Sequence, residues 1–231
     1  VAPDTDEFVA QLKRFAATCR VVKALTGMRV GVIGARTSAF KSVRYDETVL
    51  ERHGVEVETY DLTSIMKIYN SLSDSDGSVL EWRRDLNAAM NCSAAPAGRD
   101  LVLAKFGAAV ESVIKTAKLD AIAIRCWSEL QELLGIAPCS ILGLLNHKGI
   151  SAACETDVSN AVAMRALAAA SGRSAGCLDL NNNYGAEENK CILFHCGPLP
   201  EELMELPGVI EDHKMLSKGK PEKCSWGLNV G

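Results

Sequence analysis

Ionisable side chains follow three apolar runs of the sequence, and their types point to metal binding and proton transfer. Glu129 follows one run, Glu155 and Asp157 follow the next, and His195 ends a later one. If these runs are parallel strands of one sheet, their carboxyl ends share one edge and bring the side chains together. Carboxylates from two strands with an imidazole suit Mn²⁺ or Mg²⁺, which favour oxygen ligands and tolerate nitrogen.

Each of these residues also has a purely structural interpretation. Asp157 precedes a predicted helix and could simply cap its first turn. Glu129 lies in the first turn of another helix, where a negative charge suits the helix dipole. His195 could be a core or edge histidine of an apolar strand. The joint occurrence at three strand ends favours a functional site, and both interpretations stay open.

Three further residues are candidates for contact with a sugar. Trp127 lies two residues before Glu129, and its indole could stack on a sugar face or be buried in the core. Asn181, in the run Asn181–Tyr184, could offer its amide to sugar hydroxyls, although Asn is also common in turns. Glu155 could contact the substrate next to Asp157.

The elements that must position these residues are strands alternating with helices. This alternation predicts an α/β fold of three layers, α/β/α, with a mainly parallel sheet that is doubly wound in a Rossmann-like or flavodoxin-like way. We expect strands at 29–34, 55–60, 120–126, 150–154, 174–179 and 190–195. We expect helices at 5–25, 45–53, 61–69, 79–91, 99–117, 128–134, 138–148 and 158–171. Residues 181–185 read as a turn, and 201–231 as mostly irregular.

Composition argues against several other classes of protein. The net charge is −4, and the 25 Lys and Arg residues form no basic stripe, so we expect no nucleic-acid partner. No apolar run is long enough to cross a bilayer, so we expect no membrane partner. The Gly31–Gly34 stretch reads G-x-x-G rather than G-x-G-x-x-G, so we expect no dinucleotide cofactor.

The nine cysteines show no C-x-x-C pair and no regular spacing. Several lie inside apolar patterns, where Cys acts as a small hydrophobe. This pattern disfavours a zinc ribbon or a disulfide framework, and it favours a reducing cytoplasm.

Several strings of residues, taken in order, resemble those of the L-fucose isomerase-like proteins, relatives of L-arabinose isomerase. The matching strings are Ile124–Glu129, Ala153–Val158 and Phe194–Pro198. The segment Asn160–Met164, which follows the second string, also matches, as does Val32–Arg36 with Phe40 near the start. The resemblance covers roughly residues 28–200. It implies an oligomeric, Mn²⁺-dependent enzyme that interconverts aldoses and ketoses.

The resemblance also implies roles and a domain plan. A Glu and an Asp act as metal ligands and proton carriers in the family, and the matching residues are Glu129 and Asp157. The family's His ligand comes from a C-terminal domain, so His195 is a candidate by position alone. We expect a helical segment at 1–27, the α/β domain at 28–200, and a segment at 201–231 that leads to a domain outside this chain. The alternative function is a non-catalytic sugar-binding, regulatory or oligomerisation domain on the same fold.

Overall fold

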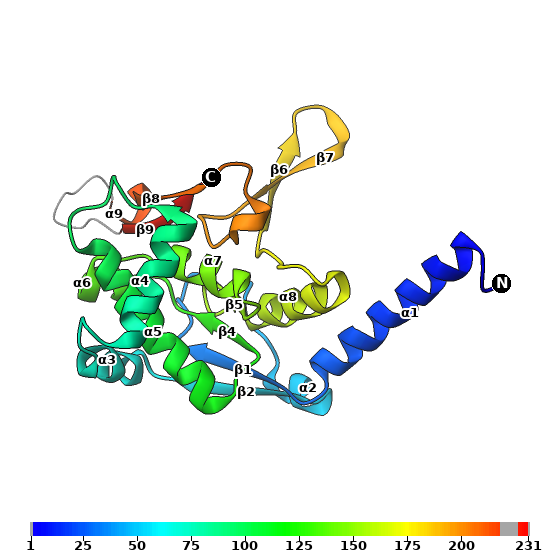
Figure 1. Cartoon of the computed structure of the whole chain (residues 1–231), viewed down its shortest axis with the longest axis horizontal. Helices are drawn as coiled ribbons and strands as arrows, with labels where there is room; N and C mark the ends of the chain where they lie inside the picture. Colours follow the sequence, from blue (N-terminus) through cyan, green and yellow to red (C-terminus); the bar gives the residue numbers. More distant parts are fainter. Residues whose placement is uncertain (1, 218–225, 231) are drawn as a thin grey trace.

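A four-stranded parallel sheet forms the centre of this computed structural model, which describes residues 2–217 and 226–230 (Figure 1). Its strands run in the order β2-β1-β4-β5. Their bounds are Met28–Ile33 for β1, Val55–Tyr60 for β2, Ala121–Ile124 for β4 and Ser151–Ala153 for β5. All three pairings are parallel, as the alternation of strands and helices predicted.

Both faces of this sheet are covered by apolar side chains, which is why its strands read as continuous apolar runs. Along β4, Ile122 and Ile124 point into one core, while Ala121 and Ala123 point into the other. The predicted three-layer α/β/α architecture is therefore confirmed.

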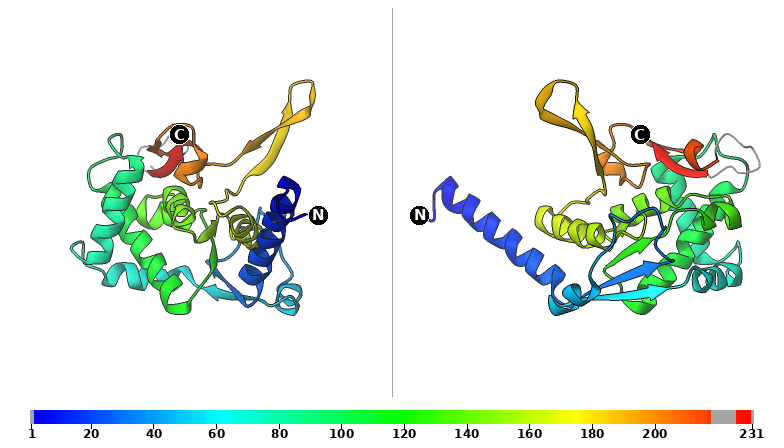
Figure 2. Two further views of the ribbon diagram at one scale, coloured as in Figure 1. Left: turned by 45° about the vertical axis from the view of Figure 1, so that its right-hand side comes forward. Right: turned by 180° about the vertical axis from the view of Figure 1, so that it is seen from behind.

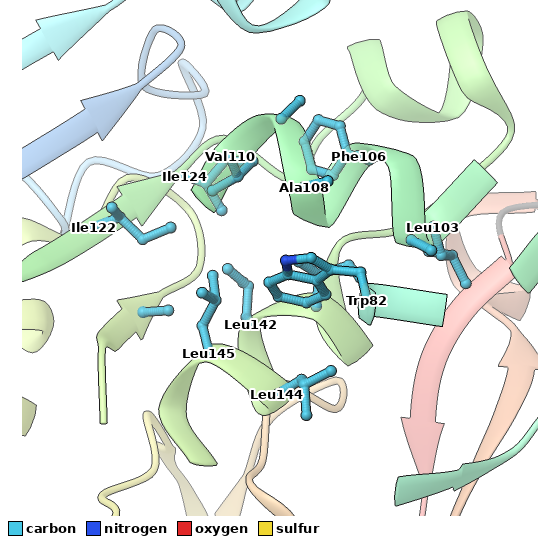
Figure 3. Close-up of a cluster of buried hydrophobic side chains, with 14 of the residues drawn as sticks. Trp82, Leu103, Phe106, Ala108, Val110, Ile122, Ile124, Leu142, Leu144 and Leu145 are labelled. Atoms are coloured by element: carbon cyan, nitrogen blue, oxygen red, sulfur yellow. The ribbon is translucent and has the colours of Figure 1, made fainter. Parts of the chain in front are cut away.

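The larger core lies between the sheet and a group of helices that includes α4 and α5. Trp82 of α4 is fully buried there, with Phe106 of α5 and Leu142 of α7 among its neighbours in the cluster (Figure 3). Helix α8 covers the other face through Val158, Ala161 and Met164. The helix bounds are Asp6–Leu25 for α1, Glu47–Arg52 for α2, Leu62–Ser71 for α3, Gly77–Ala89 for α4, Arg99–Ala117 for α5, Glu129–Leu134 for α6, Cys139–His147 for α7 and Val158–Ser171 for α8.

Helix α1 extends away from the sheet, and its C-terminal half lies beside α8 (Figures 1 and 2). The Arg20 guanidinium donates hydrogen bonds to the carbonyls of Ala169 and Ala170 at the end of α8. No residue of α1 is buried. Among the described residues, no helix has the length and apolarity that a bilayer crossing requires.

The predictions for the fifth and sixth strands were wrong. Residues 174–178 form no strand, and Asp179–Tyr184 (β6) pairs antiparallel with Glu187–Phe194 (β7) in a separate hairpin. The hairpin projects from the body, and every residue of both strands is exposed (Figure 2). The prediction of a turn at 181–185 was also wrong for its first four residues. Residues 181–184 form the second half of β6, and Gly185 lies in the turn that joins β6 to β7. The apolar run of β7 marks an exposed ribbon, which periodicity alone does not distinguish from a buried strand.

The C-terminal segment, predicted to be irregular, instead contains regular structure. Gly208–Asp212 (β8) lies between Met90–Asn91 (β3) and Trp226–Val230 (β9) in a small mixed sheet. A 3₁₀ turn (η1) spans Glu201–Leu203, and a short helix (α9) spans Lys214–Ser217. The prediction for 218–225 and 231 lies outside the described residues. Strands β8 and β9 are short, contain glycine or follow a proline, and gave too little periodicity to be recognised.

Candidate active site at the carboxyl edge of the sheet

The strand order places a topological switch point between β1 and β4, where ligands of doubly wound folds gather. Arg125, just after β4, spans this point and donates a hydrogen bond to the Ala35 carbonyl after β1. Gly34 makes the approach possible, because a Cβ there would lie 3.0 Å from the Cβ of Arg125 and its φ is +82°. The two loops that flank the switch point are thus held against each other.

An aromatic pair lies over the same loops. The rings of Phe40 and Trp127 meet edge to face with centroids 5.3 Å apart. The Thr37 hydroxyl donates a hydrogen bond to the Trp127 carbonyl, which fixes the loop that carries Phe40. Both aromatic side chains remain partly exposed, so Trp127 is not simply core.

Glu129 begins α6 and forms a salt bridge with Arg125. Its Oε2 lies 2.5 Å from Nε of Arg125. The Arg125 guanidinium also contacts the Trp127 carbonyl. Glu129 therefore belongs to the same loop network as the aromatic pair, with its charge compensated.

Asp157 caps α8, as its structural interpretation proposed. Its Oδ1 accepts a hydrogen bond from the backbone N–H of Asn160 at 2.9 Å, and its Oδ2 accepts one from Nδ2 of Asn160 at 2.8 Å. Each carboxylate oxygen thereby accepts one hydrogen bond.

Between β5 and α8 the backbone adopts an unusual conformation at two consecutive residues. Glu155 and Thr156 have φ values of +62° and +58°, a left-handed region that is uncommon outside glycine and an outlier for a β-branched residue. The N–H of Thr156 donates to the Ile124 carbonyl at 3.1 Å, which fastens this turn to the end of β4. Such conformations cost about 1–3 kcal/mol each and cluster at functional sites.

The same turn presents a carboxylate with altered acidity. Burial raises the pKa of Glu155 above its usual value, and the nearby His195 partly opposes the effect. Burial would lower the pKa of His195, but hydrogen bonds with Cys177 and Cys196 raise it. The Glu155 carboxylate and the His195 imidazole, whose pKa values are both raised, therefore lie close enough to interact electrostatically. The structure brings Glu155 and His195 together even though His195 lies at the base of the hairpin rather than on the central sheet.

Asn181 lies elsewhere. It is an exposed residue of β6 at an irregularity of the hairpin register, between Leu180 and Asn182. Its role in binding a sugar stays a prediction.

The described residues do not gather the predicted ligands Glu129, Asp157 and His195 into one metal-binding group. Each is already held by a partner: Glu129 by Arg125, Asp157 by Asn160, and His195 by Cys196. The Mn²⁺ site that these three residues were expected to form therefore stays a prediction.

A cavity of about 320 Å³ opens at this edge of the sheet. Its lining includes Gly34, Arg36 and Arg44 from the β1 loop, and Thr156 from the strained turn. Two other hollows are larger. One of about 530 Å³ lies beside α4 and β3, and one of about 460 Å³ lies near the amino end of β5. We favour the smaller cavity because it lies at the carboxyl ends of the strands, where doubly wound folds bind ligands.

Sequence reasoning missed a cluster of cysteines next to this edge. Cys139 begins α7, Cys154 directly follows β5, and Cys196 follows the hairpin. Hydrogen bonds from Cys139 and Cys154 hold the pKa of Cys196 far below its usual value, against the effect of its burial. The His213 ring also contacts Cys196. No spacing motif in the sequence indicates this cluster, because its members come from separate segments of the chain.

Comparison with known proteins points to sugar isomerases. The chain is 28% identical over 199 residues to a protein of Priestia megaterium named sulfoquinovose isomerase, which covers 84% of this chain and 44% of that protein. It is 29% identical over 202 residues to a protein of the same name from Alkalicoccus urumqiensis, covering 83% of this chain and 44% of that protein. A third, from a Clostridium species (strain MSTE9), is 24% identical over 198 residues. No protein-family model matches the chain.

The matches extend over most of this chain but over less than half the length of the curated relatives. The chain is therefore similar to one part of these sugar isomerases.

Proposed function

We propose that this chain forms part of an aldose–ketose sugar isomerase whose reacting centre lies at the carboxyl edge of the parallel sheet. The observation that carries the proposal is the strained Glu155–Thr156 turn, which presents a carboxylate of raised pKa next to a cationic imidazole. The similarity to proteins named sulfoquinovose isomerase supports the reaction class.

Isomerisation moves a proton between C1 and C2 of the sugar through an enediol. A carboxylate with a pKa near the working pH removes and returns this proton most effectively, and Glu155 is the carboxylate whose pKa burial raises toward that range. The His195 imidazolium would donate a hydrogen bond to the oxyanion that develops as the proton leaves. We assign proton transfer to Glu155 in preference to Asp157, because both oxygens of Asp157 accept hydrogen bonds from Asn160.

The surrounding residues suit a sugar with an anionic group. Phe40 and Trp127 offer an aromatic surface for the apolar face of a ring. Arg36 and Arg44 line the neighbouring cavity and could pair with an acid group. Sulfoquinovose, a glucose derivative with a sulfonate on C6, meets both requirements, so we propose it or a similar acidic aldose as the substrate.

Two further features belong to the proposal. Metal dependence with Mn²⁺ or Mg²⁺ stays a prediction, and no step above depends on it. We also propose that the protein is a homo-oligomer, because Val9, Leu12, Phe15 and Val22 of α1 are exposed in the part of the chain that the structure describes.

The test is an isomerase assay on the full-length product of the gene, run in D₂O with sulfoquinovose, aldopentoses and deoxyhexoses. NMR follows ketose formation and deuterium entry at C1 or C2, with Mn²⁺, with Mg²⁺ and with chelator. We expect conversion in the wild type and a loss of about 10²-fold or more in kcat for Glu155→Gln. Glu132→Gln, an exposed carboxylate of the nearby α6, is the matched control and should retain activity.

Sugar binding without conversion or deuterium exchange would favour the non-catalytic alternative. Normal turnover of Glu155→Gln would remove Glu155 from the mechanism. If Asp157→Asn or Glu129→Gln alone abolished turnover, proton transfer would belong to those residues instead.

A further inference from the structure

We propose that Cys139, Cys196 and His213 hold a thiophilic divalent metal ion and that this ion is Zn²⁺. This site is distinct from the carboxylate site considered above, and it does not depend on the proposed isomerase activity. Three observations carry it: the mutual distances of the donor atoms, their burial, and an unpartnered imidazole nitrogen.

The donor atoms already lie close enough to share one ion. The two Sγ atoms and one ring nitrogen of His213 all fall within 4.8 Å of one another. A tetrahedral zinc ion, with Zn–S bonds of about 2.3 Å, holds its sulfur ligands about 3.8 Å apart. Small side-chain rotations therefore suffice to bring the three donors onto a common ion.

The surroundings are those of an enclosed site. Cys139 is 1% exposed and His213 is 3% exposed, while Cys196 is partly buried. Nε2 of His213 is buried and has no hydrogen-bond partner among the described residues. A buried polar group without a partner costs free energy, and coordination of a metal at Nε2 would give this nitrogen its missing partner.

The chemistry of the donors selects the metal. Two thiolates and an imidazole favour Zn²⁺ over Mn²⁺ or Mg²⁺, which prefer oxygen ligands. Cys154 makes a hydrogen bond with Cys196 and is buried, which makes it a candidate for a fourth ligand. A set of three Cys and one His is a familiar ligand set for structural zinc.

The site would join parts of the chain that are far apart in sequence. Cys139 begins α7 in the main core, Cys196 follows the hairpin, and His213 lies between β8 and α9. One ion would therefore fasten the C-terminal sheet and the base of the hairpin to the parallel-sheet domain. It would also fix the position of His195, which precedes Cys196.

The first test measures metal in the purified protein by mass spectrometry and by exchange with Co²⁺. We expect about one equivalent of zinc per chain, and cobalt–thiolate absorption bands with the intensity of a tetrahedral centre. Adding Zn²⁺ to metal-stripped protein should raise Tm by about 5 °C or more. An equal concentration of Mg²⁺ should not change Tm.

The variants Cys139→Ala and His213→Gln should lose the bound zinc, the cobalt bands and the rise in Tm. Cys191→Ser and His53→Ala alter an exposed thiol and an exposed imidazole, and both should behave as the wild type. Because removal of a ligand can also prevent folding, the cobalt spectrum of the wild-type protein is an independent test. Wild-type protein without zinc, without thiolate–cobalt bands and without a Tm response would overturn the proposal, as would full zinc binding by folded variants at both positions.

Discussion

At the residue scale, the two acidic residues that follow β5 lie in different environments. Asp157 satisfies the first turn of α8 through both of its oxygens. Glu155 occupies a left-handed conformation and has a raised pKa because it is buried. The pair lies two positions apart in sequence, yet the turn makes Asp157 a helix cap and leaves Glu155 half-buried outside the cap.

A cap predicts a specific pattern of stability. Asp157→Ala should lower the free energy of unfolding by about 1 kcal/mol, because the N–H of Asn160 loses its acceptor. Asp157→Ser should stay close to the wild type, since Ser caps nearly as well. Urea unfolding followed by circular dichroism measures both changes.

Asp61→Ala is the matched control for this prediction. Asp61 precedes α3 but makes no side-chain cap hydrogen bond, so its loss should have little effect. Equal destabilisation by Asp61→Ala and Asp157→Ala would contradict the capping role.

At the element scale, the contact between α4 and α5 depends on a glycine. A Cβ on Gly107 of α5 would lie 2.5–2.8 Å from ring atoms of Trp82. The indole has little freedom to move away, because Nε1 of Trp82 donates to Glu111 and Nζ of Lys148 lies 4.4 Å from the ring centroid. The helices can approach this closely only where α5 has no side chain.

Gly107→Ala should therefore lower the free energy of unfolding by about 1–3 kcal/mol through overpacking. This loss should exceed the gain of about 1 kcal/mol that alanine brings to a helix interior. Gly77→Ala, at the start of α4, meets no atom within 4 Å and should be neutral or slightly stabilising. Thermal unfolding of both variants checks the difference, and a more stable Gly107→Ala protein would contradict the packing argument.

At the scale of the whole molecule, α1 and the hairpin extend beyond the body (Figure 1). Helix α1 exposes apolar residues at helical spacing, and Phe15 is 68% exposed and Val22 is 60% exposed. Exposed apolar patches of this kind mark protein interfaces. A second copy of the chain is the partner that the proposed homo-oligomer requires.

Light scattering after size exclusion should show an oligomer of the wild-type protein. Phe15→Glu should shift the population toward the monomer, because a charge replaces a large apolar contact. Lys13→Glu, which places a negative charge on the same helix without removing an apolar residue, is the control and should leave the oligomer in place. A monomeric wild type would contradict the prediction.

The sequence by itself determined the parallel sheet and most of its helices. The segments 99–117 and 158–171 are long and rich in residues that favour helices, such as Ala, and these two helices have the predicted bounds. The sequence also predicted a chemical centre at the end of β5, because Glu155 and Asp157 follow a short buried run, and this stays a prediction. Local patterns of this kind can be recognised in a sequence because each depends on residues that are close together in the chain.

Tertiary structure decided the rest, since it depends on contacts between distant segments. Only the folded chain places His195 near Glu155, and only there does the apolar run of β7 prove to be an exposed hairpin. The cysteines showed no motif because Cys139 and Cys196 meet across 57 positions of sequence, with His213 a further 17 away. Spacing rules detect ligands on one local element, whereas this cluster is formed by the packing of three.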